Sequence, residues 1–258
     1  MPTPRSRSML FARGISPLFL AALTLTLLSL PAAAYESVQV TEGGTINGKV
    51  VYQGDVFTRR IIPTKDTETC GGIREEPLIT VGSDKGVQGA VVYLKDIQKG
   101  KGLAKPPKNP EINNLNCQFD PHVQAVPVGS IVVVNSDPVM HNTHGFLGKQ
   151  TVFNQAMPTK GLRIEKPIRK AGMMRIECDV HGWMLGWVYA AEHPYHAVTR
   201  KDGSFSIPDV PPGSYTLVAW QEATDVTELP VTVKPKEATQ QTIELKNATE
   251  QNLELKKK

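Results

Sequence analysis

The sequence predicts an all-β protein built from two β-sandwiches, one of which is discontinuous along the chain. Short apolar runs bounded by Gly, Pro, Asn and Asp recur along it, and this spacing is typical of sandwich strands. Only 6% of the 258 residues are aromatic, while 20 Pro and 21 Gly argue against a long helical bundle. No long amphipathic helical pattern is present.

The N-terminal segment has the pattern of a secretory signal peptide. Arg5, Arg7 and Arg13 precede an apolar run at residues 15–30, which ends in Pro-Ala-Ala-Ala at residues 31–34. Its removal takes away three arginines and no acidic residue, so the formal net charge falls from +4 to +1. We therefore expect a periplasmic protein that has no membrane span after processing, binds no nucleic acid and works where disulfides persist.

Strands are expected on both sides of a basic, Pro-rich linker at residues 99–110. Residues 58–85 have no sustained period, so we expect loops there, with at most one strand at residues 78–81. The expected strands are residues 45–52, 89–94, 123–128, 131–134, 162–168, 172–177, 187–190, 198–199, 204–207, 215–220, 231–233 and 242–245.

The cysteines give the clearest chemical signal. There are three, so in an oxidising compartment one sulfur is left outside a disulfide. Cys178 is followed closely by His181 and Met184, which together form a soft ligand set. A His₂Cys site with a weak axial Met is the arrangement of blue copper centres. His141, which follows an apolar strand and an Asn-Ser-Asp-Pro turn, supplies the second histidine from a loop.

Other interpretations of these residues stay open. A free cysteine in a β-sandwich is commonly a small buried hydrophobe, but that leaves His141, Met184 and the odd cysteine count unexplained. A zinc site needs a fourth firm ligand, and a thioether is a poor one. His144, three residues after His141, is a further candidate ligand.

Two motifs together resemble the cupredoxins, most closely the amicyanin-like and plastocyanin-like type 1 copper proteins. They are His-Asn-Thr-His at residues 141–144 and Cys-x₂-His-x₂-Met at residues 178–184. The resemblance covers about residues 112–192 and implies a Greek-key sandwich that binds one copper ion. The implied ligands are His141, Cys178, His181 and Met184. In the family, the position of Asn142 ties the two ligand loops together by hydrogen bonds, and the position of His144 is not a ligand.

The resemblance also implies a role. It implies an electron carrier, not an enzyme, that serves a protein partner such as a c-type cytochrome or a periplasmic oxidoreductase. Trp183 and Leu185 would form an apolar docking patch, and the exposed ring edge of His181 would be the point of electron entry and exit. The alternative is a periplasmic protein that binds or handles copper, or anchors to a surface, without transferring electrons.

The other two cysteines are expected to form a disulfide. With Cys178 as a ligand, Cys70–Cys117 is the one pairing that does not consume the proposed ligand. It would link the long loop region to the start of the copper-binding domain.

A second resemblance covers the remaining strands. Residues 199–217 (TRKDGSFSIPDVPPGSYTL) look like the carboxypeptidase regulatory-like, transthyretin-type sandwich, whose first strands resemble residues 48–50 and 90–94. An inserted cupredoxin would explain the separation, because insertions are tolerated at exposed loops. The expected organisation is a signal peptide (1–34), the first strands of this sandwich and a linker (35–111), the cupredoxin domain (112–192), the rest of the sandwich (193–247) and a polar tail (248–258). No catalytic motif is present in it.

Overall fold

The structure is a computed structural model that describes residue 1 and residues 35–246. Residues 2–34 of the expected signal peptide and the expected polar tail lie outside the described residues. The described chain contains 22 strands and one short helix, which confirms the predicted all-β class. Within the same residues, no helix has the length and apolar character needed to cross a membrane.

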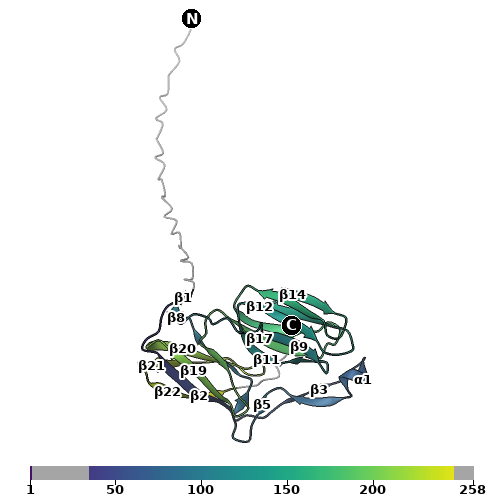
Figure 1. Cartoon of the computed structure of the whole chain (residues 1–258), viewed down its shortest axis with the longest axis horizontal. Coiled ribbons are helices and arrows are strands. Elements are labelled where there is room, and N and C mark those ends of the chain that lie inside the picture. Colours follow the sequence, from purple (N-terminus) through teal and green to yellow (C-terminus); the bar gives the residue numbers. More distant parts are fainter. Residues whose placement is uncertain (2–34, 247–258) are drawn as a thin grey trace. The chain divides into compact units, whose positions relative to one another are not determined.

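The central sandwich, residues 111–191, consists of a four-stranded and a five-stranded sheet (Figure 1). The first has the order β10-β9-β12-β15, with bounds β9 Glu111–Leu115, β10 Gln118–Asp120, β12 Gly129–Asn135 and β15 Arg163–Ile168. The second has the order β11-β17-β16-β13-β14, with bounds β11 Val123–Pro127, β13 His141–Leu147, β14 Gln150–Met157, β16 Gly172–Glu177 and β17 Leu185–Ala191. β9 runs parallel to β12 and β11 parallel to β17, whereas the other neighbours are antiparallel.

Alternating side chains fill the space between these two sheets. Ile131 and Val133 of β12 are fully buried and share one cluster with Met174 and Ile176 of β16. Successive strand residues point to opposite faces, so Ile131 and Val133 lie on the same face of β12, and this face packs into the core. Burial of each such side chain contributes about 1.5–3 kcal/mol. The core therefore fixes the strands whose ends carry the candidate ligands.

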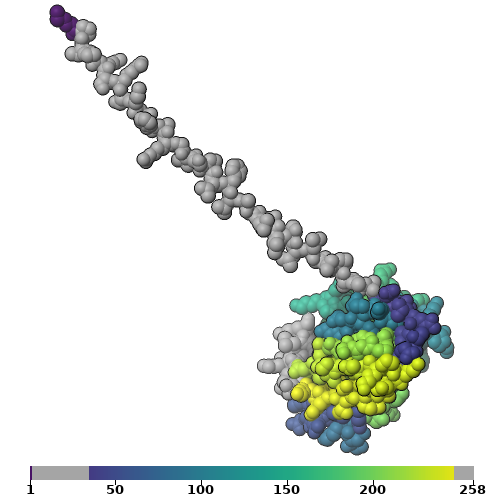
Figure 2. Space-filling view, turned by 90° about the vertical axis from the view of Figure 1, so that its left-hand side faces the viewer, coloured from purple at the N-terminus to yellow at the C-terminus, as the bar shows by residue number. Residues whose placement is uncertain are grey.

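The outer sandwich combines strands from both sides of the central one. One of its sheets has the order β18-β7-β20-β21 and the other the order β19-β2-β22. Their bounds are β2 Gly44–Tyr52, β7 Val91–Lys95, β18 His196–Val198, β19 Ser204–Val210, β20 Gly213–Trp220, β21 Thr227–Val233 and β22 Ala238–Leu245. β2 runs parallel to β22 over eight residue pairs, so early and late segments lie side by side; Figure 2 shows them in purple-blue and yellow. The domain boundaries proposed from the sequence stay a prediction.

Residues 58–77 form an arm that the sequence did not predict. Instead of loops, the structure has the antiparallel pair β3 (Thr58–Ile61) and β4 (Arg74–Pro77), with the one-turn helix α1 (Thr67–Cys70) between them. A second short pair follows, formed by β5 (Thr80–Val81) and β6 (Val87–Gln88). A disulfide between Cys70 and Cys117 ties α1 to the β9–β10 turn, and this confirms the predicted pairing.

The two sandwiches contact each other through aromatic side chains. Trp187 and Trp220 lie with their ring centroids 5.0 Å apart in an edge-on arrangement, and both belong to a buried cluster with Val91 and Tyr189. Trp187 also donates a hydrogen bond from Nε1 to Glu222. This contact brings the connection between β20 and β21 close to the metal loop described below.

Most predicted strands are present with shifted ends, but strands outside the arm were also missed. β9 and β10 lie where no strand was predicted. The hairpin β13–β14 was missed, because its strands are polar and carry no β-branched run. The expected linker at residues 99–110 begins with the short strand β8 (Lys99–Gly100), which pairs with β1 (Glu36–Ser37). The hairpin matters for function because its first residue is His141.

Candidate metal centre

The metal loop, residues 178–184, connects two neighbouring strands of the five-stranded sheet. β16 ends at Glu177 and β17 begins at Leu185, so Cys178 and Met184 are each adjacent to a strand end. The Met184 amide donates to the carbonyl oxygen of His181 at 2.9 Å and closes a tight turn. Cys178, His181 and Met184 are all buried. The short loop therefore holds three soft donors in the interior.

His141 reaches the same place from the opposite direction. It is the first residue of strand β13, not part of a loop as the sequence suggested. The turn before it is fixed by Asn135, whose side-chain amide donates to the carbonyls of Val139 and Met157. The Asn135 Oδ1 accepts the backbone N–H of Asp137. This polar turn places His141, which is fully buried, beside the metal loop.

Three donor atoms converge in this interior. The Nδ1 atoms of His141 and His181 are 2.9 Å apart, and the Cys178 Sγ lies 4.0 and 3.8 Å from them, respectively. Metal–nitrogen and metal–sulfur bonds of about 2.0 and 2.3 Å, the values of zinc sites, join donors at such separations. The triangle therefore has the dimensions of a metal site. Among the residues that the structure describes, two other groups of close donors include Cys70 or Cys117, whose sulfurs are committed to the disulfide.

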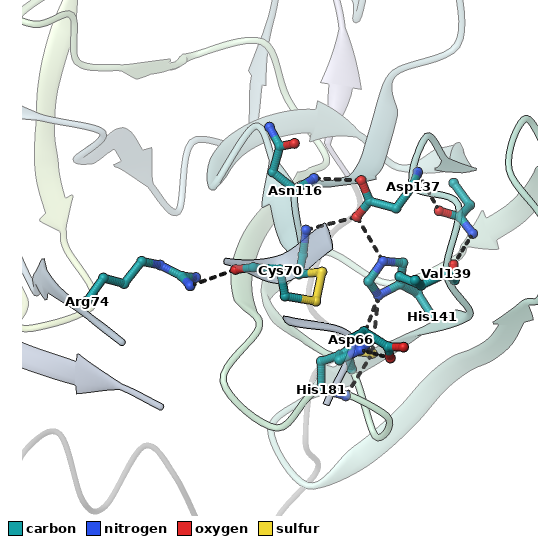
Figure 3. The surroundings of a disulfide bond; sticks show 11 residues. Asp66, Cys70, Arg74, Asn116, Asp137, Val139, His141 and His181 are labelled. Atoms are coloured by element: carbon teal, nitrogen blue, oxygen red, sulfur yellow. Dashed lines mark hydrogen bonds and ion pairs between the residues drawn. A yellow bond between two sulfur atoms is a disulfide. The ribbon is translucent and has the colours of Figure 1, made fainter. Parts of the chain in front are cut away.

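Each histidine also contacts a carboxylate through Nε2, the ring nitrogen that does not face Cys178. The Nε2 of His141 lies 2.9 Å from Asp137 Oδ2, and the Nε2 of His181 lies 2.9 Å from Asp66 Oδ2 (Figure 3). Such contacts place the proton on Nε2 and leave the Nδ1 lone pair for a metal. Burial lowers the pKa of His141, although the hydrogen bond to Asp137 acts in the opposite direction. The Nδ1 atoms of both imidazoles therefore lie close to the Cys178 sulfur.

One disulfide links the segments that position the two carboxylates, Asp66 and Asp137. Asp66 precedes α1, and Cys70 ends it, so the bridge anchors the segment that carries Asp66. On the other side, the backbone N–H of Cys117 donates to Asp137 Oδ2 at 2.8 Å, and that of Asn116 donates to Oδ1 at 2.7 Å. Figure 3 shows the bridge between these two acidic residues. Sequence reasoning missed both carboxylates; the turn before His141 was a signal for Asp137, but none existed for Asp66.

The sulfur of Cys178 also has hydrogen-bond donors. The backbone N–H groups of Asn142 and His181 lie 3.5 and 3.4 Å from Sγ. The Asn142 side chain accepts the N–H groups of Asp179 and Val180 through Oδ1, at 2.6 and 3.3 Å. Asn142 thus joins β13 to the metal loop.

His144 lies outside the donor triangle. Its Nδ1 is 3.2 Å from the Asp179 carboxylate, and its Nε2 is 3.0 Å from Thr151 Oγ1. The ring packs on Phe146 with centroids 3.9 Å apart. Although partial burial acts against it, hydrogen bonds from His144 and the neighbouring amides lower the pKa of Asp179. Both ring nitrogens of His144 are thus engaged with polar side chains away from Cys178.

The expected exposed edge of His181 is absent. Its side chain is 0% exposed, because Asp66 covers Nε2 and the Trp183 ring lies 5.0 Å from the imidazole. Trp183 and Leu185 are half-buried and line a cavity together with Met184. The expectation was wrong because the arm, which has no counterpart in the motif, supplies the cover. The docking role of Trp183 and Leu185 stays a prediction.

The donor set suits copper better than other common metals. A thiolate and two imidazoles fit zinc or copper, but the next donor along the loop is the thioether of Met184, a soft ligand that favours copper(I). The described carboxylates near the site, Asp66 and Asp137, are occupied by the Nε2 atoms and do not face the triangle as ligands. The residues present therefore fit a copper ion held by His141, Cys178 and His181 with Met184 close by.

A known sequence family matches only part of this chain. Residues 178–241 match the sequence family described as polysaccharide lyase family 4, domain II. Among curated proteins, nothing matches this chain.

Solved structures are similar over about a third of this chain. A copper-containing nitrite reductase from Thermus scotoductus is 22% identical, with 34% of this chain and 23% of that chain covered and a TM-score of 0.29. A purple cupredoxin from Nitrosopumilus maritimus is 23% identical, with 32% and 100% covered and a TM-score of 0.29. An oxidised variant of amicyanin is 20% identical, with 33% and 84% covered and a TM-score of 0.30. The match spans under a quarter of the reductase, so function has to be argued from the site itself.

Proposed function

We propose that this chain is an exported type 1 copper protein that passes single electrons between periplasmic redox partners. The observation that carries the proposal is the buried triangle of two Nδ1 atoms and the Cys178 sulfur, with both Nε2 atoms held by carboxylates. Copper bound there would supply a one-electron couple, and the protein would supply a site that changes little between oxidation states.

Each residue has a defined part in that role. His141, Cys178 and His181 would hold the ion, and Met184 would be a further, weaker ligand. Asn142 keeps the two ligand segments together, and Asp66 fixes the ring of His181. Because these side chains are already ordered and buried, little of the site needs to reorganise during electron transfer. A c-type cytochrome or a periplasmic oxidoreductase would be the protein partner.

A copper-handling role is the second candidate, and one observation favours it. His181 is fully buried beneath Asp66, so the ring edge offers no direct contact to a partner protein. A site sealed in this way suits retention of copper(I) as well as electron exchange. In that case the protein would store or deliver copper and would not act as a carrier.

Copper reconstitution distinguishes the two roles. For the electron carrier, copper(II) should give intense visible charge-transfer absorption and a type 1 EPR signal, with a reversible one-electron potential. Cys178→Ser should abolish the colour while circular dichroism stays unchanged, because a hydroxyl is a poor replacement for a thiolate. His144→Gln, which alters a histidine outside the triangle, is the matched control and should keep the colour. Colourless retention of copper(I) alone would favour the handling role, and an unchanged spectrum in Cys178→Ser would refute the site.

A further inference from the structure

A cavity of about 480 Å³ lies beside the metal loop and is not used by the proposed electron transfer. Residues of the arm, of the central sandwich and of the β20–β21 connection line it together. Its volume is within the range of about 300–1,000 Å³ that is typical of sites for small organic ligands. The polar and apolar residues in its wall show which ligand chemistry it would accept.

The glutamates that line the cavity are already engaged. Glu76 accepts hydrogen bonds from Arg59 at 2.9 Å, from Arg74 at 2.8 Å and from Gln118 at 2.8 Å. Hydrogen bonds from the two arginines lower the pKa of Glu76, although its partial burial acts in the opposite direction. The carboxylate is therefore ionised and its oxygens are occupied by neighbours.

The other two glutamates of the wall have partners as well. Glu222 lies 2.6 Å from His122 Nε2 and also accepts the indole N–H of Trp187. Glu177 lies 2.7 Å from Arg175 Nε. The acceptors of the cavity wall are thus satisfied from within the protein.

Two arginines of the arm, Arg59 and Arg74, keep N–H groups without a hydrogen-bond acceptor in the described part of the chain. A guanidinium has five N–H donors, and the contacts described use one nitrogen of Arg59 and two of Arg74. The Nη2 of Arg74 is buried and has no hydrogen-bond partner among the described residues. The side chain of Arg59 is 25% exposed, so its remaining N–H groups are accessible to a ligand. The cavity therefore lacks acceptors, and a ligand that carries oxygen atoms would supply them.

The rest of the wall is aromatic and aliphatic. Trp183, Trp187, Phe119 and Leu185 all line the cavity. Aromatic faces of this kind favour a planar apolar ring over a small hydrated ion. Three arginines and three glutamates line the cavity together, so its charges nearly balance and a singly charged ligand suits it better than a multiply charged one.

We propose that this cavity binds a small aromatic carboxylate. Its ring would pack against Trp183 and Trp187, and its carboxylate would accept hydrogen bonds from the planar guanidinium group of Arg59. This binding site goes beyond the electron-transfer function and is independent of a bound metal.

Titration of metal-free protein with benzoate tests this proposal, so its outcome does not depend on whether copper binds. The chain has three tryptophans, and Trp220 does not line the cavity, so their indole N–H signals in ¹H–¹⁵N spectra report where the probe binds. Benzoate should shift the signals of Trp183 and Trp187 saturably and that of Trp220 far less. Benzyl alcohol and acetate, which lack the charge or the ring, should bind at least 10-fold more weakly.

Variants of the arginines complete the test. Arg59→Gln should weaken benzoate binding at least 10-fold, whereas Arg163→Gln should leave it unchanged, because Arg163 is ion-paired with Glu111 outside the cavity. If Arg59→Gln does not fold, Arg59→Lys keeps the charge without the planar fork and should weaken binding about 3-fold. The proposal is overturned by the absence of saturable shifts, by equal binding of acetate or benzyl alcohol, or by equal affinity of the Arg59 and Arg163 variants.

Discussion

Asp66 Oδ2 lies 2.9 Å from His181 Nε2, although 115 residues separate the two in the sequence. Asp66 reaches this position from a left-handed backbone conformation with φ of 53°, which Asp tolerates better than most residues. The contact covers the ring edge that the sequence led us to expect at the surface. It also gives His181 the same kind of carboxylate partner that Asp137 gives His141.

Removal of this carboxylate should weaken metal binding without removing a ligand. Loss of an outer partner of a ligand histidine costs about 10- to 100-fold in affinity, so Asp66→Ala should reduce copper affinity by that factor in a chelator competition. Asp66→Asn keeps an acceptor oxygen and should lose less. Asp84→Ala, which breaks an ion pair with Lys49 in the outer sandwich, is the control. Equal affinities for Asp66→Ala and Asp84→Ala would contradict a positioning role for Asp66.

Loss of the disulfide should destabilise the whole fold. Cys70 and Cys117 are 47 residues apart, and closing a loop of that length contributes about 4 kcal/mol in the chain-entropy model. The double variant Cys70→Ser/Cys117→Ser should lower the free energy of unfolding by up to this amount in urea titrations. Because the bridge anchors the segment that carries Asp66, copper affinity should fall as well. A loss below about 1 kcal/mol would show that the bridge constrains the unfolded chain little.

Met184 should control the reduction potential and not the colour. An oxygen donor favours copper(II) more than a thioether does, so Met184→Gln should lower the potential while it keeps the charge-transfer band. Voltammetry and visible spectra of the same samples provide the measurement. Met173→Gln, at a residue of β16 outside the metal loop, is a control that should leave the potential unchanged. A potential equal to that of the native protein would exclude Met184 as a ligand.

His193 should make stability depend on pH. Burial lowers the pKa of His193 to about 4, with a smaller contribution from His196, whereas the unfolded chain takes up a proton near pH 6.5. The free energy of unfolding should therefore fall as pH decreases from about 6.5 to 4, by up to about 3 kcal/mol from this residue. His193→Gln should show a shallower fall than the native protein in denaturant titrations at each pH. Parallel curves for the two proteins would contradict this assignment.

The strands that sequence reasoning found share a simple property. Residues 131–134 and 215–220, for example, are short, mainly apolar runs with turn residues nearby, so local chemistry was sufficient to predict β12 and β20. The hairpin β13–β14 was missed because its polar residues pair through backbone hydrogen bonds that leave little trace in the side-chain pattern. Register with a neighbouring strand, and not local propensity, defines these strands.

The candidate site was likewise predictable only where its residues are close in the sequence. The spacing from Cys178 to Met184 is local, and it led directly to the buried donors of the metal loop. Asp66 belongs to a segment with no periodic pattern, and its partner His181 is distant in sequence, so only the tertiary structure could bring them together. The covered state of His181 follows from the same long-range contact and was therefore mispredicted.

The pairing of β2 with β22 has a consequence for the order of synthesis. β2 emerges from the ribosome early, but residues 238–245, its parallel neighbour, are translated near the end of the chain. The strands of the central sandwich pair only with one another in the described sheets, so that part has all its partners much sooner. A chain that folds from its N-terminal end can therefore complete the central sandwich while the outer sandwich still waits for its last strand. A polypeptide chain truncated before Ala238 would leave one edge of β2 unpaired and prone to pair with another chain.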